Sequence, residues 1–281
     1  MFAPGGPSLR ELAVQALSSV EHGYDLLAPK FDRTPFRTSR RVLDAVAAAL
    51  AEEGPFDEGL DLCCGTGAGT EVTARLCRTG ATGLDFSAGM LAVARSRTHG
   101  APPAVPPTGA DGGPAAAVPS GPACAPAGVR TSWVRADARA LPFRSAFDLV
   151  VSFGALGHFL PRELPGLFAQ VQGVLRPGGL FALPVLAPPR PASPAFWTLL
   201  GFDTVMRVRN ALWRPPFVMY YRTMYLGGVL RELERAGFRV ELRPLAGFGR
   251  RDDGTPRARL VVARRPPEGP GGGPSARPPA G

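Results

Sequence analysis

The sequence predicts an α/β fold in which a parallel sheet carries helices on both faces. Two observations favour this class. Short apolar runs alternate with amphipathic stretches along the chain, and most connections between them are short. The chain also has 281 residues, of which 45% are hydrophobic, and this suits one large domain with a full core. In such sheets ligands bind beyond the carboxyl ends of the strands, so candidate site residues are sought there.

The predicted strands are apolar runs bounded by turn residues, at 59–63, 81–86, 130–136, 147–153, 180–185, 238–244 and 259–264. The first helix should begin at Ser8, because Ser8 and Glu11 have the spacing of a capping box. A second clear helix covers 161–175: its apolar stripe repeats at helical spacing, and "RPGG" ends it. Another helix is expected near 225–236.

Three segments stand apart from this alternation. Residues 100–128 and 266–281 consist mostly of Pro, Ala and Gly, so we expect a disordered insertion and a disordered tail. Residues 187–224 are too long for an ordinary connection, and their aromatic and arginine side chains favour a cap over a substrate. A dimer contact or an extra helix pair is the alternative. The remaining chain, 1–265, is predicted to form a single domain.

Composition excludes several other classes. No apolar run is long enough to span a bilayer and the N-terminus lacks the apolar block of a signal peptide, so we expect a soluble, cytoplasmic protein. The four cysteines lack zinc or disulfide spacing, so no metal is expected. The formal charge is +9, but the basic residues are scattered and Lys30 is the only lysine. A nucleic-acid partner is therefore disfavoured.

A glycine-rich turn follows the first strand, where residues 59–72 read "GLDLCCGTGAGTEV". It contains no lysine, which excludes a phosphate-binding P-loop. Thr70 and Val72 stand where a dinucleotide fingerprint needs its third glycine, so that motif fits poorly as well. Asp61 beside the turn would repel a pyrophosphate but attract an ammonium group. The turn therefore favours a cationic ligand.

Two further carboxylates follow later strands. Asp85 ends the second strand, twenty positions after Gly65, where an acid can accept hydrogen bonds from both hydroxyls of a ribose. Phe86 next to it offers an apolar face to a base. Asp137 follows the third strand, where it could accept from an exocyclic amine of the base or simply cap the next turn. Three successive strands thus end near an aspartate.

These residues resemble the class I S-adenosylmethionine-dependent methyltransferases. The matching stretches occur in order across residues 24–185 and are "LDLCCGTG", "GLDFSAGML", "ADARALPF", "FDLVVSFGALGHF" and "LRPGG". Within that family the chain is most similar to small-molecule enzymes akin to the ubiquinone and menaquinone C-methyltransferases. One reason is "YDLLAPKFD" at 24–32, which resembles their N-terminal lid, here the helical segment 7–53.

The resemblance implies a Rossmann-like sheet of seven strands, mostly parallel, whose last strand runs antiparallel beside the strand at 238–244. It implies S-adenosylmethionine as cofactor, with Asp61 and the turn at its aminoacid end, Asp85 at the ribose and Asp137 at the adenine. Cys63 departs from the family, because many members have glycine there. The cofactor-binding residues expected on these grounds are Tyr24, Asp61, Cys63, Gly65, Thr66, Gly67, Asp85, Phe86, Met90, Asp137 and Ala138.

His158 is the candidate catalytic residue. It follows the fourth strand, where it could take a proton from a hydroxyl or form part of the pocket wall. Tyr24 and Phe31 could close over the sulfonium of the cofactor, or belong to a helix core. Cys63 and Cys64 are interpreted as small packing residues rather than nucleophiles.

The predicted function is methyl transfer to a small organic acceptor, apolar or aromatic in character. A base amine or glutamine amide is disfavoured as acceptor, because "SFGA" stands where related enzymes carry an Asn/Asp-Pro-Pro-aromatic signature. Two alternatives stay open: an RNA or protein methyltransferase, supported only by the net charge, and a cofactor-binding scaffold without turnover. The sequence leaves the oligomeric state open.

Overall fold

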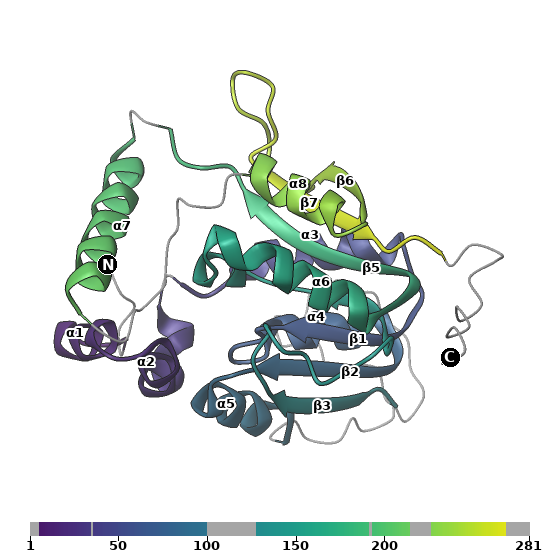
Figure 1. The fold of residues 1–281 in the computed structure, drawn as a ribbon, viewed down its shortest axis with the longest axis horizontal. Helices are drawn as coiled ribbons and strands as arrows, with labels where there is room; N and C mark the ends of the chain where they lie inside the picture. The colour runs from purple at the N-terminus through teal and green to yellow at the C-terminus, as the bar shows by residue number, and fades with distance from the viewer. Residues whose placement is uncertain (1–5, 35, 100–127, 191–192, 214–225, 268–281) are drawn as a thin grey trace, which may run out of the picture.

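The structure is a computed structural model, and it describes residues 6–34, 36–99, 128–190, 193–213 and 226–267. Within them a seven-stranded sheet has the order β3-β2-β1-β4-β5-β7-β6 (Figure 1). Its strands are β1 Phe56–Leu62, β2 Cys77–Asp85, β3 Arg130–Arg135, β4 Phe147–Val151, β5 Leu175–Leu186, β6 Arg239–Pro244 and β7 Ala258–Arg264. Strands β1 to β5 pair in parallel, and β7 is antiparallel to both β5 and β6. The predicted fold class and the direction of the last strand are confirmed.

Helices cover both faces of this sheet. They are α1 Leu9–Leu17, α2 Val20–Leu27, α3 Arg40–Ala51, α4 Ala68–Leu76, α5 Ala88–His99, α6 Leu164–Val174, α7 Pro194–Leu212 and α8 Leu226–Arg235, with 3-10 turns η1 Ala28–Arg33, η2 Ala155–His158 and η3 Pro161–Glu163. On one face α6 and α8 pack on a core that includes Val150; on the other, α3 packs on a core that includes Leu149 and Val151. This alternation follows from the two-residue period of side chains along a strand.

Several element boundaries differ from the sequence prediction, most clearly the starts of β5 and β2. The predicted helix 161–175 begins as η3 and continues as α6 only to Val174, because Leu175 is buried and pairs with Phe147 of β4. Strand β5 therefore starts five residues earlier than predicted. Strand β2 also starts earlier, at Cys77, since Cys77 pairs with Phe56 and Gly80 with Glu58 of β1, although Arg78 and Thr79 between them are polar. Strand pairing, which the local sequence does not encode, sets both boundaries.

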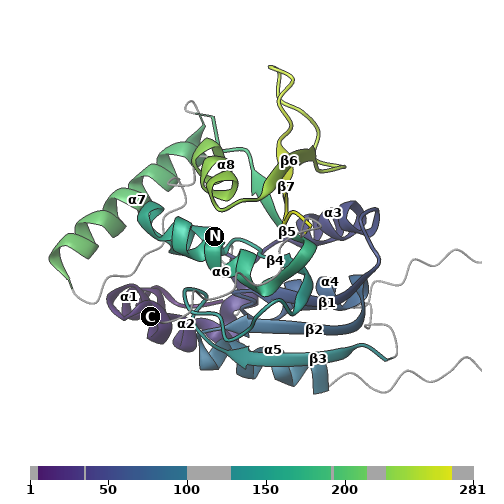
Figure 2. The same cartoon turned by 45° about the vertical axis from the view of Figure 1, so that its right-hand side comes forward.

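The N-terminal helices and α7 gather at the end of the sheet where the parallel strands finish (Figures 1 and 2). The capping box predicted for Ser8 and Glu11 is present, with the Ser8 amide 2.7 Å from Glu11 Oε2. Helix α7 lies within the predicted cap segment 187–224, and Ser193 caps its start. The predicted insertion and tail fall almost entirely outside the described residues. None of the described helices is long and apolar enough to cross a membrane.

Close packing between β1 and α4 depends on a missing side chain. A Cβ added to Gly59 would lie 2.3 Å from Thr73 Cγ2 and 2.6 Å from Cys77 Sγ, both fully or almost fully buried. These neighbours cannot yield easily, since the interior is close-packed. Gly59 therefore lets α4 lie directly on the strand that leads into the glycine turn.

We expect Gly59→Ala to lower the free energy of unfolding by about 1–3 kcal/mol, the usual effect of overpacking. Gly166→Ala is the matched control, because Gly166 lies on the exposed side of α6 and a Cβ there meets nothing within 4 Å. The control should raise the free energy of unfolding by about 0.5–1 kcal/mol through helix propensity. Urea unfolding of the three proteins measures both effects; equal stability of Gly59→Ala and the wild type would contradict the close packing.

Candidate functional site

The glycine turn between β1 and α4 has a left-handed backbone at three alternate positions. The φ angles are +59° at Cys63, +52° at Gly65 and +90° at Gly67. A Cβ on Gly65 would meet nothing within 4 Å, so the backbone there faces open space. Cys63 is the position where related sequences have glycine, and the left-handed φ explains that preference. The cysteine keeps this strained conformation while its side chain packs against the core.

Asp61, next to last in β1, is buried against the first turn of α4. Its Oδ2 accepts a hydrogen bond of 2.9 Å from Thr70 Oγ1, and its side chain approaches so closely that a Cβ on Gly69 would lie 2.6 and 2.8 Å from the two carboxylate oxygens. The other oxygen, Oδ1, is buried and has no hydrogen-bond partner among the described residues. Burial raises the pKa of Asp61 to about 7, with a smaller contribution from Asp85. An unsatisfied buried oxygen is unfavourable unless a ligand donates to it.

Asp85 is the last residue of β2, and its side chain binds the backbone of the glycine turn and of the segment that leads into α5. Its carboxylate accepts from the amide of Gly65 at 2.8 Å and from the amide of Ser87 at 2.9 Å. Burial raises the pKa of Asp85 even though these bonds oppose the shift. A carboxylate can accept about four hydrogen bonds, so this one can still accept others. Next to it Phe86 is half-buried, and Met90 of α5 is buried.

Asp137 lies two residues beyond β3 and is more exposed than the other two acids. Arg139 donates its amide and its Nε to this carboxylate at 2.9–3.1 Å, so Asp137 caps a turn, as the alternative interpretation predicted. Ala138 beside it is buried in the core. Burial raises the pKa of the Cys63 thiol, and the charges of Asp85, Asp61 and Asp137 add to that shift. The three predicted acids are therefore close enough to Cys63 for their charges to act on its thiol.

Two acids of the N-terminal segment hold it against this site, and sequence reasoning did not identify them. Asp25 accepts from Ser87 Oγ at 2.5 Å and from the Gly89 amide at 2.8 Å, where α5 begins. Asp32 accepts from Thr66 Oγ1 of the glycine turn at 2.9 Å. Both acids belong to "YDLLAPKFD", but only their spatial neighbours show what they bind.

Arg97 of α5 completes the second of these contacts. It forms an ion pair with Asp32 and donates to the Thr66 carbonyl at 3.0 Å. The N-terminal segment is thereby tied to the turn itself as well as to the helix that follows β2.

Tyr24 of α2 contacts His158, the last residue of the 3-10 turn η2 after β4. Its hydroxyl lies 2.9 Å from His158 Nε2, and the two rings meet edge to face with centroids 5.3 Å apart. The ring of Phe31 lies 6.2 Å from that of Tyr24. Burial raises the pKa of Tyr24, and the negative charge of Asp85 contributes. A phenol is the better donor of the pair and an imidazole nitrogen the better acceptor, so the hydroxyl donates to Nε2.

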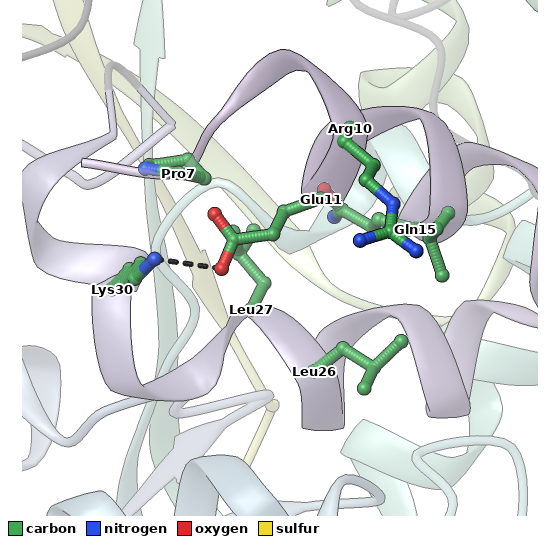
Figure 3. A pocket seen from close by; sticks show the side chains of 8 residues that line it. Pro7, Arg10, Glu11, Gln15, Leu26, Leu27 and Lys30 are labelled. Atoms are coloured by element: carbon green, nitrogen blue, oxygen red, sulfur yellow. Dashed lines mark hydrogen bonds and ion pairs between the residues drawn. The ribbon is translucent and has the colours of Figure 1, made fainter.

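A cavity of about 190 Å³ lies elsewhere, between α1 and α2 (Figure 3). Arg10, Glu11 and Lys30 line it together with apolar side chains, and Lys30 forms an ion pair with Glu11 at 2.6 Å (Figure 3). It contains none of the predicted site residues, and it is smaller than the roughly 300–1,000 Å³ of typical ligand pockets. Within the described ranges no cluster of three or more His, Cys, Asp or Glu side chains could hold a metal ion.

Residues 60–183 match the family model described as a methyltransferase domain. The chain is 28% identical, over 193 residues, to an uncharacterized methyltransferase of Synechocystis; the match covers 64% of this chain and 76% of the relative. The matched region begins in β1 and ends in β5, so it includes the glycine turn, Asp85, Asp137 and His158.

Solved structures share the fold at low sequence identity. An O-methyltransferase family protein of Burkholderia thailandensis has a TM-score of 0.57 at 17% identity, covering 92% of this chain and 68% of its own. Magnesium protoporphyrin IX methyltransferase of Synechocystis, solved with bound S-adenosylhomocysteine, has a TM-score of 0.51 at 18% identity, covering 80% and 82%. These likenesses concern the fold alone.

The chain's own residues fit an adenosyl cofactor with an ammonium group. Asp61 Oδ1 is a buried acceptor without a donor among the described residues, and the backbone at Gly65 faces open space beside it. The charges around this turn are negative, which suits a cationic ligand. With the match of residues 60–183 to the methyltransferase-domain model and the similarity to the Synechocystis methyltransferase, these features identify the chain as an S-adenosylmethionine-dependent methyltransferase.

Proposed function

We propose that this enzyme transfers the methyl group of S-adenosylmethionine to a small organic acceptor of apolar or aromatic character. The observation that carries the proposal is the 2.9 Å contact between Tyr24 and His158. It closes the N-terminal segment across the carboxyl end of the sheet, beside the carboxylates that would hold the cofactor. A site covered by the N-terminal segment in this way would suit a small molecule better than a strand of RNA or a protein surface.

The cofactor residues are assigned by charge and position. Asp61 Oδ1 would accept from the ammonium group of the cofactor, and the turn at Cys63, Gly65, Thr66 and Gly67 would lie along its aminoacid end. Asp85 would accept from the ribose hydroxyls. The adenine would lie near Phe86 and Met90. Asp137 and Ala138, which follow β3, would lie on its other side. The bound cofactor supplies an electrophilic methyl group on a good leaving group.

The chain's own residues have three tasks in this reaction: to align the acceptor, to exclude water and, for an oxygen acceptor, to remove a proton. The lid formed by α1, α2 and η1 would exclude water, since Asp25 and Asp32 hold it on the site. Because the Tyr24 hydroxyl donates to His158 Nε2, an acceptor hydroxyl would give its proton to the Tyr24 oxygen while Tyr24 passes its own proton to Nε2, so that His158 is the final base.

The apolar character of the acceptor rests on the side chains next to Tyr24. Met206 and Phe202 of α7 cluster with Tyr24, Val20 and Phe36, and this cluster would form part of the acceptor wall. The cap segment 187–224, which contains α7, would thus take part in binding. A quinone-like or phenolic ring fits this environment, in line with the resemblance to quinone C-methyltransferases.

An acceptor panel tests the proposed function. The enzyme is incubated with S-adenosylmethionine and quinones, phenols, aromatic acids, short RNA or basic peptides, and S-adenosylhomocysteine formation is measured by mass spectrometry. We expect turnover with at least one small aromatic acceptor and none with RNA or peptide. Cofactor binding without turnover on any acceptor would favour a scaffold, and salt-sensitive RNA methylation would favour the polymer alternative.

Binding of S-adenosylhomocysteine at about pH 6 should release close to one proton from Asp61. The carboxyl is mostly protonated there because burial raises its pKa to about 7, and an ammonium group at Oδ1 favours the charged form. Affinity should therefore rise with pH up to about 7 and then level off. Titration calorimetry in buffers of different ionisation enthalpy counts the protons.

Asp61→Asn should abolish this proton release. Asp44→Asn, an exposed acid of α3, is the matched control and should keep it. If Asp61→Asn still released the same number of protons on binding, the assignment of Asp61 to the ammonium group would be wrong.

His158→Asn should lower turnover on a hydroxyl acceptor by about 10²–10⁴, the usual share of general-base catalysis. The rise of rate with pH that comes from deprotonation of the imidazole should vanish as well. His22→Asn is the matched control, since His22 is exposed on α2. Rates and pH profiles are measured on the acceptor from the panel, with S-adenosylhomocysteine affinity as the check on the fold. Equal rates and parallel pH–rate profiles in the wild type and His158→Asn would show that His158 only lines the acceptor pocket.

A further inference from the structure

Arg97 of α5 joins the lid to the glycine turn. Its guanidinium forms an ion pair with Asp32 of η1 and donates to the carbonyl of Thr66 at 3.0 Å. Asp32 in turn accepts from the Thr66 hydroxyl at 2.9 Å. The three residues therefore form a closed ring of polar contacts, which holds Thr66 by its side chain and by its backbone. Thr66 is buried there, with only 3% of its surface exposed.

The backbone on either side of Thr66 gives this ring of contacts its importance. Gly65 and Gly67 have φ angles of +52° and +90°, and glycine leaves the backbone more freedom than any other residue. The turn therefore needs bonds that select one of its conformations. One such bond runs from the Gly65 amide to Asp85 of the sheet, at 2.8 Å. The ring around Thr66 is another, and it depends on the lid.

The second acid of the lid also binds next to a cofactor residue. Asp25 accepts from the Ser87 hydroxyl at 2.5 Å, and the amide of the same serine donates to Asp85 at 2.9 Å. The lid backbone lies so close to α5 that a Cβ on Gly89 would be 2.9 Å from Asp25 Cα and 3.0 Å from its carbonyl oxygen. Helix α5 lies beside α2 and η1 (Figures 1 and 2). Both lid acids thus bind residues that belong to the glycine turn or donate to the acid at the end of β2.

The ion pair of Arg97 and Asp32 adds little to the stability of the fold. The two side chains are 38% and 24% exposed, and partly exposed ion pairs are weak. Burial also lowers the pKa of Arg97, because it disfavours the charged form. A contact that served stability alone would need no bond to the turn. The specific consequence of this one is that the lid and the turn hold each other in place.

We propose that Asp32 and Arg97 are positioning residues for the cofactor, which link closure of the lid to the shape of the glycine turn. With the lid closed, the ring of contacts holds the turn in the form that lies along the aminoacid end of the cofactor. With the lid open, Thr66 loses its bond to Asp32, Arg97 loses its partner, and the turn binds the cofactor more weakly. Because coupling is reciprocal, the bound cofactor also holds the lid closed. The inference rests on the cofactor assignment proposed above.

Binding of S-adenosylhomocysteine tests this link without any acceptor. Arg97→Gln should weaken the affinity at least about fivefold, the lower end of typical coupling between sites, mainly through faster dissociation. Asp32→Ala should do the same. The double variant should bind no more weakly than the weaker single variant, because both substitutions break one link. Calorimetry gives the affinities, and surface plasmon resonance gives the dissociation rates.

Gly89→Ala tests the link by a steric route. The added Cβ would push the lid backbone at Asp25 away from α5, while alanine favours the helix itself, so the affinity should fall without weakening α5. Hydrogen exchange separates coupling from folding. Saturating S-adenosylhomocysteine should slow exchange of the amides of residues 20–33 in the wild type, and should protect them less in Arg97→Gln and in Gly89→Ala.

Arg95→Gln is the matched control, since Arg95 is exposed on the same helix and has no hydrogen bond or ion pair among the described residues. It should bind S-adenosylhomocysteine and protect the lid like the wild type. The proposal is overturned if Arg97→Gln and Gly89→Ala keep the wild-type affinity and dissociation rate, or if the bound ligand leaves exchange of the lid unchanged in the wild type. The Asp61→Asn titration tests the cofactor assignment, and the acceptor panel tests the proposed reaction, so a failure of either is distinguished from a failure of the link.

Discussion

The bond from the Gly65 amide to the buried carboxylate of Asp85 is the interaction on which the site depends. At 2.8 Å it fixes the glycine turn after β1 to the end of β2, and the same carboxylate holds the Ser87 amide where α5 begins. The position of the turn determines where α4 starts, and α4 in turn encloses Asp61 through Thr70 and Gly69. The two buried acids differ in their partners: backbone amides donate to Asp85, whereas Oδ1 of Asp61 has no donor among the described residues.

Acids gather near the glycine turn in a chain of formal charge +9: Asp25, Asp32, Asp61, Asp85 and Asp137. Arg97 pairs with Asp32 and Arg139 with Asp137, which leaves Asp61 and Asp85 as the acids buried beside the turn without an arginine partner among the described residues. A concentration of one sign in a partly buried site raises the local concentration of ligands of the opposite sign. Asp25 and Asp32 also hold the lid, so the residues that close the site and those that attract a cation belong to one electrostatic group.

The sequence could predict what depends on local pattern and spacing. The strands, the glycine-rich turn and the acids at the strand ends all leave such a signal, and the direction of β7 came from family resemblance. Contacts between distant segments leave no such signal. The bonds of Asp32 to Thr66, Asp25 to Gly89 and Tyr24 to His158 join residues 34, 64 and 134 positions apart. The early start of β5 has the same origin, because Leu175 is held by Phe147 across the sheet.

Cys63 has a strained left-handed backbone and a thiol that lies near charged carboxylates. A non-glycine residue at φ +59° costs about 1–2 kcal/mol relative to a relaxed backbone. In return the side chain occupies space among three carboxylates and packs against the core. Burial and that negative field raise the pKa of the thiol, so it stays neutral and adds no fourth charge. A small side chain that stays neutral at this position therefore adds no charge to the acids near the turn, and the backbone at Gly65 faces open space beside it.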